Sequence, residues 1–197
     1  MIRNLVFDMG GVLYRWEPET ALRLYPGEDG RILYGAVYGS PDWWRQDSGE
    51  IDEDGMIAAA RARLPDRLKP EAARLVRWYE LTGPVPGMEE LARDLSEKGY
   101  PLYLLSNVGF AFHKFKSMIP ALKYFTGEFI SAEHRLLKPD PEIFRVFLGE
   151  FGLRAEESLF VDDVAANIEG AQAAGMEGIV FEGAVNLRRQ FRERGIL

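Results

Sequence analysis

The stretch Leu5-Val6-Phe7-Asp8-Met9-Gly10-Gly11-Val12-Leu13 decides the fold of this chain. Its first three apolar residues predict a short buried strand, and the aspartate and two glycines that follow predict where that strand ends. In sheets of parallel strands, ligands bind at the carboxyl ends of the strands. Asp8 is therefore expected at a ligand-binding edge. Gly10 and Gly11 allow the backbone there to approach a phosphate and to donate N–H groups to it.

Polar or charged side chains also follow later apolar runs, in the pairs Ser106-Asn107, Lys138-Pro139 and Asp162-Asp163. The strands are expected at 5–7, 102–105, 128–131, 159–161 and 178–181, with helical patterns at 87–98, 141–150 and 165–174. Alternating strands and helices predict parallel βαβ units. The sequence therefore predicts an α/β protein whose core is a Rossmann-like parallel sheet.

The segment between the first two strands has a different pattern. Residues 16–83 show helical periodicity and no convincing strand, with Asp52 as the expected N-cap of one helix and 71–81 as a second helix. We interpret this segment as a small α-helical cap over the carboxyl edge of the sheet. The predicted division is a catalytic core formed by residues 1–15 and 84–197, with a cap formed by residues 16–83.

Composition narrows the function classes. The 197 residues carry a net charge of −7, which argues against nucleic-acid binding because that function needs a basic face. Cysteine is absent, so disulfides and thiol catalysis are excluded. No apolar stretch is long enough to span a bilayer. We expect a cytoplasmic protein, a monomer or a homodimer, that binds neither nucleic acid nor membrane.

The candidate site residues suggest phosphoryl chemistry. An aspartate such as Asp8 can act as a covalent nucleophile that takes up a phosphoryl group. Two adjacent carboxylates near Asp8 repel one another unless a hard cation lies between them, and Mg²⁺ prefers such oxygen ligands. Asp162 or Asp163 can alternatively cap the helix at 165–174. Ser106, Asn107 and Lys138 can hold phosphoryl oxygens, although each by itself is also typical of a turn or a solvated surface.

Taken together, these motifs resemble those of the haloacid dehalogenase superfamily, in the subgroup with a small helical cap after the first strand. The resemblance implies that Asp8 is the nucleophile and that Ser106 and Lys138 bind the transferring phosphoryl group. It also implies that Mg²⁺ is bound by Asp8, the Gly10 carbonyl and Asp163, with Asp162 acting through water or as a support.

One position departs from the family pattern. Many phosphatases of this superfamily carry an acid–base aspartate two residues after the nucleophile, where this chain has Gly10. General acid–base help is typically worth about 10²–10⁴-fold in rate. The candidate substitute acids are Glu17, Asp47 and His113, although an ordinary solvated or core-edge position is the favoured interpretation of each. A branch resembling alpha-glucose-1-phosphate phosphatases has the same pattern and suggests a sugar phosphate as one possible substrate.

The leading interpretation is therefore a Mg²⁺-dependent hydrolase of a small phosphorylated metabolite. Trp44 and Arg45, next to Trp43, are expected to line the cleft under the cap, although packing in the cap core is the somewhat favoured explanation for either tryptophan. The alternatives are a 2-haloacid dehalogenase, which needs no metal, and a catalytically weakened binding or scaffold protein.

Overall fold

The computed structural model describes residues 1–197 and contains one five-stranded parallel sheet, in the order β3-β2-β1-β4-β5. The strands are β1 (Asn4–Phe7), β2 (Leu102–Ser106), β3 (Gly127–Ile130), β4 (Ser158–Asp162) and β5 (Glu177–Val180). The sequence predicts all five strands, and no strand end differs from the prediction by more than one residue. The predicted α/β fold with a parallel sheet is confirmed.

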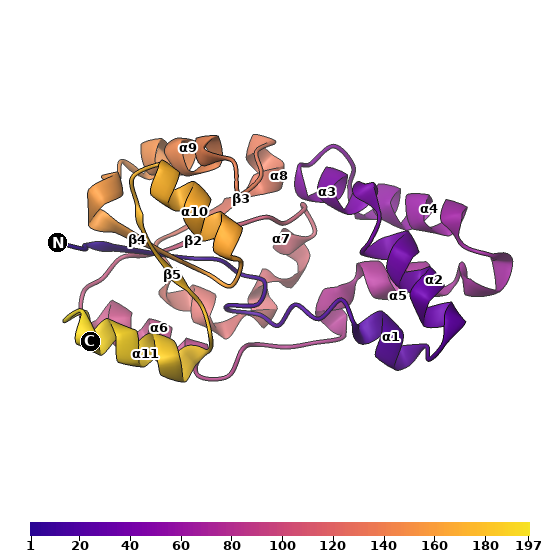
Figure 1. The fold of residues 1–197 in the computed structure, drawn as a ribbon, viewed down its shortest axis with the longest axis horizontal. Helices are drawn as coiled ribbons and strands as arrows, with labels where there is room; N and C mark the ends of the chain where they lie inside the picture. The colour runs from indigo at the N-terminus through magenta and orange to yellow at the C-terminus, as the bar shows by residue number, and fades with distance from the viewer.

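Helices cover both faces of this sheet (Figure 1). On one face α6 (Met88–Glu97) and α11 (Ala184–Glu193) pack on Leu5 and Phe7 of β1. On the other face α9 (Pro141–Phe151) and α10 (Ala165–Ala173) pack on Val6. Successive strand residues point to opposite faces, so both sides of β1 are buried and the strand is uniformly apolar, as is typical of parallel sheets.

Strand register brings the polar residues to one edge. Phe7 pairs with Leu104 of β2 and with Val161 of β4. Asp8 therefore lies level with Asp162, and Ser106 lies at the end of the neighbouring strand. Residues that are far apart in the sequence meet at this edge because the strands are parallel and central.

The segment between β1 and α6 is helical, as the sequence predicts. It contains α1 (Thr20–Leu24), α2 (Glu28–Val37), α3 (Pro41–Asp47), α4 (Glu53–Arg63), η1 (Asp66–Leu68), α5 (Glu71–Val76) and η2 (Trp78–Glu80). These helices lie together to the right of the sheet in Figure 1. We refer to them as the helical insertion, and the boundary at residues 16 and 83 stays a prediction.

The chain enters and leaves the helical insertion along two adjacent segments. The Arg15 N–H donates to the Gly83 carbonyl at 2.9 Å, and the Val85 N–H donates to the Leu13 carbonyl at 3.0 Å. The apolar cluster that packs on one face of the sheet also continues into the insertion. The helical insertion is therefore tied to the sheet by backbone pairing and by a shared core.

Two details differ from the prediction. The helix expected over 71–81 is interrupted at Arg77, where ψ is 46°, and the chain continues as the 3₁₀ turn η2. The carbonyl of Leu75 accepts a hydrogen bond from the Tyr38 hydroxyl at 2.8 Å. The sequence also predicts a helix over 109–118, where the chain forms only α7 (Phe112–Phe115) and η3 (Lys116–Met118). At the first of these places the Tyr38 hydroxyl takes the carbonyl that a continued helix would use.

Short elements complete the chain: η4 (Pro120–Tyr124), α8 (Ser131–His134) and η5 (Ala155–Glu157). No helix in the structure combines the length and the apolar character needed to cross a bilayer.

Candidate active site

Lys138 joins two aspartates at the carboxyl edge of the sheet. Its Nζ atom lies 2.8 Å from Asp8 Oδ1 and 2.6 Å from Asp162 Oδ2, and all three side chains are buried. Burial and the neighbouring Asp162 charge raise the pKa of Asp8 to about 7, although Lys138 acts in the opposite sense. Burial lowers the pKa of Lys138, but Asp8 and Asp162 outweigh this effect and hold it above its ordinary value. Lys138 is therefore a fixed cation beside Asp8.

Asn107 holds the backbone of Lys138. The Asn107 side-chain amide donates to the Lys138 carbonyl at 2.9 Å, and the Lys138 N–H donates back to Asn107 Oδ1 at 2.8 Å. The ammonium group of Lys138 also donates to the Leu105 carbonyl at 3.1 Å. Asn107 was expected to bind phosphoryl oxygens directly. Although it lines the cavity, its amide atoms are used to position Lys138.

Asp162 has no free lone pair directed at the cavity. Its Oδ1 accepts from the Val164 N–H at 2.8 Å and from Asn167 at 3.1 Å, while Oδ2 accepts from Lys138 and from Asn167 at 3.0 Å. These contacts fit the supporting role that the family resemblance implies. They leave Asp8 and Asp163 as the carboxylates able to bind a metal directly.

The site offers the oxygen donors that Mg²⁺ prefers. Ligand atoms of Asp8, Asp162 and Asp163 all lie within 4.8 Å of one another, and the side chain of Asp163 makes no hydrogen bond or ion pair with another side chain. The carbonyl of Gly10 accepts no backbone hydrogen bond. Asp8, Asp163 and the Gly10 carbonyl therefore fit a magnesium ion.

Gly10 and Gly11, which we call the glycine loop, bring the backbone close to Asp163. Gly11 has φ = 77°, and a Cβ atom there would lie 2.1 Å from Asp163 Oδ2. The Gly11 N–H donates to the Tyr14 carbonyl at 2.9 Å, so it is not free to bind phosphate as the sequence suggested. Gly11 therefore serves by leaving room for Asp163. Gly10 lines the cavity, and its N–H donates to no backbone carbonyl, which makes it the available donor.

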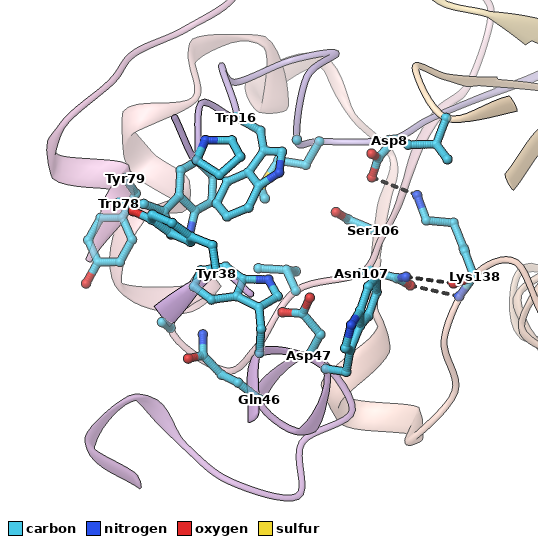
Figure 2. Close-up of a pocket in the computed structure, with 18 of the residues that line it drawn as sticks. Asp8, Trp16, Tyr38, Gln46, Asp47, Trp78, Tyr79, Ser106, Asn107 and Lys138 are labelled. Carbon is cyan, nitrogen blue, oxygen red and sulfur yellow. Dashed lines mark hydrogen bonds and ion pairs between the residues drawn. The ribbon is translucent and has the colours of Figure 1, made fainter. Parts of the chain in front are cut away.

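A cavity of about 490 Å³ opens in front of Asp8. Asp8, Ser106 and Lys138 lie on one side of it, and aromatic side chains of the helical insertion lie on the other (Figure 2). The Ser106 hydroxyl is buried at this edge and donates to no protein group. The cavity therefore joins the polar end of the sheet to an apolar chamber in the helical insertion.

Of the two residues expected to line the cleft under the cap, Trp44 lines the cavity and Arg45 does not. Trp44 lines the rim of the cavity and is 58% exposed. Arg45 does not line it, because its guanidinium is held by Asp42 at 2.7 Å and by Glu50 at 3.1 Å. The expected position of Arg45 in the cleft is therefore not found.

Only one of the three substitute acids faces the cavity. Glu17 pairs with Arg23 at 2.6 Å, and His113 lies 2.9 Å from Glu133; both are outside the lining. Asp47 is buried and lines the cavity together with Asp8. The sequence favoured none of the three over an ordinary solvated or core-edge residue, because their distances from Asp8 depend on how separate segments of the chain pack.

Comparisons with known proteins agree with this geometry. The family model for haloacid dehalogenase-like hydrolases matches residues 2–175. The chain is 30% identical over 178 residues to the sesquiterpene phosphatase astK of Aspergillus oryzae, covering 88% of this chain and 87% of the relative. It is also 25% identical over 186 residues to a phosphoglycolate phosphatase of Mannheimia succiniciproducens, covering 89% and 77%.

A solved structure shows the same arrangement of elements. A variant of a HAD family enzyme from Bacteroides thetaiotaomicron, crystallised with magnesium and inorganic phosphate, is similar with a TM-score of 0.72. The two chains are 25% identical, and the similarity covers 93% of this chain and 95% of that one.

Proposed function

Because the chain belongs to the haloacid dehalogenase-like hydrolases, we propose that it is a Mg²⁺-dependent phosphatase that acts on a small phosphorylated metabolite through a phosphorylated Asp8. The observation that carries this proposal is the placement of Asp8. Its carboxylate lies 2.8 Å from a buried lysine, within reach of Asp163, and faces a cavity of about 490 Å³. The similarity to two phosphatases and to an enzyme that binds magnesium and phosphate supports it.

In the proposed reaction an Asp8 oxygen attacks phosphorus, and the bond between phosphorus and the ester oxygen breaks. The leaving oxygen takes up a proton. Water then attacks the phosphorus of the aspartyl-phosphate, which releases inorganic phosphate and restores the Asp8 carboxylate. Lys138, the Ser106 hydroxyl and the Gly10 N–H bind the phosphoryl oxygens and stabilise their charge. A bound Mg²⁺ would add Lewis-acid stabilisation of the same oxygens.

The test is phosphate release from a panel of phosphate esters, measured with Mg²⁺ and with excess chelator. Turnover should require Mg²⁺. Asp8→Asn should abolish it, because an amide oxygen is a poor nucleophile, while Asp54→Asn, an exposed position on α4, should retain it. Mass spectrometry of acid-quenched wild-type protein should locate a phosphoryl adduct on Asp8.

The same assays decide among the alternatives. A 2-haloacid dehalogenase would release halide from a 2-haloacid in the presence of chelator. A binding or scaffold protein would bind phosphate esters without turning them over. Undiminished hydrolysis by Asp8→Asn would rule out the covalent route.

A further inference from the structure

Aromatic rings form most of the far end of the cavity. Trp16, Tyr38, Trp43 and Trp78, which we call the aromatic box, come from four separate segments of the chain. The centroid of the Trp16 ring lies 4.9 Å from that of Trp78 and 5.0 Å from that of Trp43, and the rings of Tyr38 and Trp43 are 5.2 Å apart. Each of these rings packs against at least one other ring of the aromatic box.

Two of the three tyrosines that line the cavity, Tyr38 and Tyr79, use their hydroxyls in hydrogen bonds to the protein. The Tyr38 hydroxyl donates to the Leu75 carbonyl at 2.8 Å, and the Tyr79 hydroxyl donates to Glu53 Oε2 at 2.8 Å. Lys138, at the opposite end, is the single cation of the lining. The helical insertion offers few polar partners here, among them Gln46, whose buried Oε1 accepts no hydrogen bond.

We infer that the organic group of the substrate is a hydrocarbon, so that the enzyme acts on an apolar monophosphate such as a terpenyl or aryl phosphate. This inference rests on the proposed function. A sugar has several hydroxyls, and each one that loses water in the aromatic box without a new partner weakens binding. A hydrocarbon of matching size instead gains from leaving water, since its burial is favourable against aromatic walls. The sugar phosphate that the sequence pattern suggested fits this lining poorly.

The experiment compares farnesyl phosphate, phenyl phosphate and glucose 1-phosphate as substrates, with Mg²⁺. The two apolar esters should have KM values at least about ten-fold lower than the sugar phosphate. Trp78→Ala should raise the KM for farnesyl phosphate roughly 10- to 100-fold and change that for glucose 1-phosphate little. Phe110→Ala is the matched control, because Phe110 is exposed and lies outside the cavity lining.

Binding separates this inference from the proposed function. All four tryptophans of the chain line the cavity, so their fluorescence reports occupancy in the wild-type protein without any variant. Saturable quenching by hexylphosphonate, absent with glucose, supports the apolar site even if no ester is hydrolysed. A KM for glucose 1-phosphate that is equal to or lower than those of the apolar esters would overturn the inference of an apolar substrate. The absence of quenching by hexylphosphonate would overturn it as well.

A second, independent observation concerns Asp47, the last residue of α3. Its side chain points into the space that Asp8 and Ser106 face (Figure 2), it is 6% exposed, and no cation forms an ion pair with it. A hydrogen bond of 2.6 Å from the Ser131 hydroxyl to its backbone carbonyl anchors it to the core. The structure thus holds a second carboxyl group in the reaction cavity.

The surroundings of Asp47 favour its protonated form. Burial, and then the charge of Asp8, raise the pKa of Asp47 well above the ordinary value, while the Gly109 amide, Lys138 and Trp43 act in the opposite sense. The other groups near the reacting atoms are committed elsewhere: Asp8 attacks phosphorus, and Lys138 is held by two carboxylates.

We propose that Asp47 gives its proton to the leaving oxygen as the ester bond to phosphorus breaks. The resulting carboxylate then takes a proton from the water that attacks the aspartyl-phosphate, so that the residue ends protonated as it began. This is the acid–base work for which position 10 has no side chain. The residue reaches the site from the helical insertion, so proton transfer depends on the seating of α3 against the core.

The test uses leaving groups of different basicity. Asp47→Asn should lower kcat for an alkyl phosphate roughly 10²- to 10⁴-fold and that for 4-nitrophenyl phosphate by less than about ten-fold, since nitrophenolate leaves without a proton. Gly10→Asp should restore part of the loss, because Gly10 does not have a positive φ and a Cβ there meets only the Trp16 side chain, at 3.6 Å and beyond.

Asp42→Asn is the matched control, as a buried aspartate on the same helix that lies outside the cavity. Equal losses on both substrates in a folded Asp47→Asn protein would overturn the acid–base role while leaving the phosphatase proposal intact. If the wild-type protein hydrolysed none of the phosphate esters, that result would instead refute the proposed function.

Discussion

Replacing Gly11 with alanine tests whether the glycine loop makes room for a metal-binding Asp163. The new Cβ atom would lie 2.1 Å from Asp163 Oδ2 and 2.6 Å from its Cγ. The carboxylate or the loop must then move by about 1 Å to relieve the contact, which exceeds the ~0.5 Å tolerance of a working site. We expect the Mg²⁺ concentration for half-maximal activity to rise roughly 10- to 100-fold, the range seen when groups that orient a ligand are lost.

The same change also strains the backbone. Gly11 has φ = 77°, and a residue with a Cβ atom pays about 1–2 kcal/mol in this region. For a protein of this size that penalty corresponds to a fall of about 2–8 °C in Tm. Thermal denaturation measures this effect, and a Mg²⁺ titration of phosphate release measures the first.

Gly99→Ala separates the two effects. Gly99 has φ = 88°, and a Cβ there meets nothing within 4 Å. It lies before β2, at the opposite end of the strands from Asp8. The Tm of this control should fall by a similar amount, while its Mg²⁺ requirement stays that of the wild type. A folded Gly11→Ala protein whose Mg²⁺ dependence matches that of Gly99→Ala would refute the reasoning.

Contacts of the site and of the helical insertion lead to three further predictions. Asp163→Asn should raise the Mg²⁺ requirement with little loss of Tm, whereas Asp162→Asn should lower Tm because buried Lys138 loses a charged partner; similar profiles for the two variants would contradict their assigned roles. Lys138→Met should abolish turnover and lower the free energy of unfolding by about 3–5 kcal/mol, measured by urea denaturation, because two buried carboxylates lose their cation; full stability would show that these carboxylates need no cation. For Glu53, burial raises the pKa, but hydrogen bonds from Lys114 and Tyr79 outweigh it and lower the pKa overall. Glu53 therefore stabilises the fold above its ordinary pKa of 4.5 and loses this effect as pH falls through the lowered value. The stability difference between wild type and Glu53→Gln should shrink below pH 4.5, and a constant difference would argue against the ion pairs.

Much of the core was predictable because its signals are local. An apolar run followed by Asp8 and two glycines specifies a strand and its end, and the same holds for the runs before Ser106 and Asp162. Parallel βαβ topology then brings Asp8, Ser106 and Asp162 to one edge. Lys138 lies beyond α8 and not at the end of a strand, and it reaches Asp8 and Asp162 through its side chain. The helical character of the insertion was also readable from periodicity, although α5 ends earlier than that periodicity suggests.

What the sequence alone determined, then, is the sheet, its polar edge and the candidate nucleophile, because each depends on neighbours within a few residues. Only the tertiary structure decided how the helical insertion faces that edge. It placed Asp47 in the cavity, left Glu17 and His113 outside it, and turned Arg45 toward Asp42. It also gathered the aromatic box from segments up to about sixty residues apart in the chain. The physical reason is that such contacts depend on packing between distant segments, on which no local pattern reports.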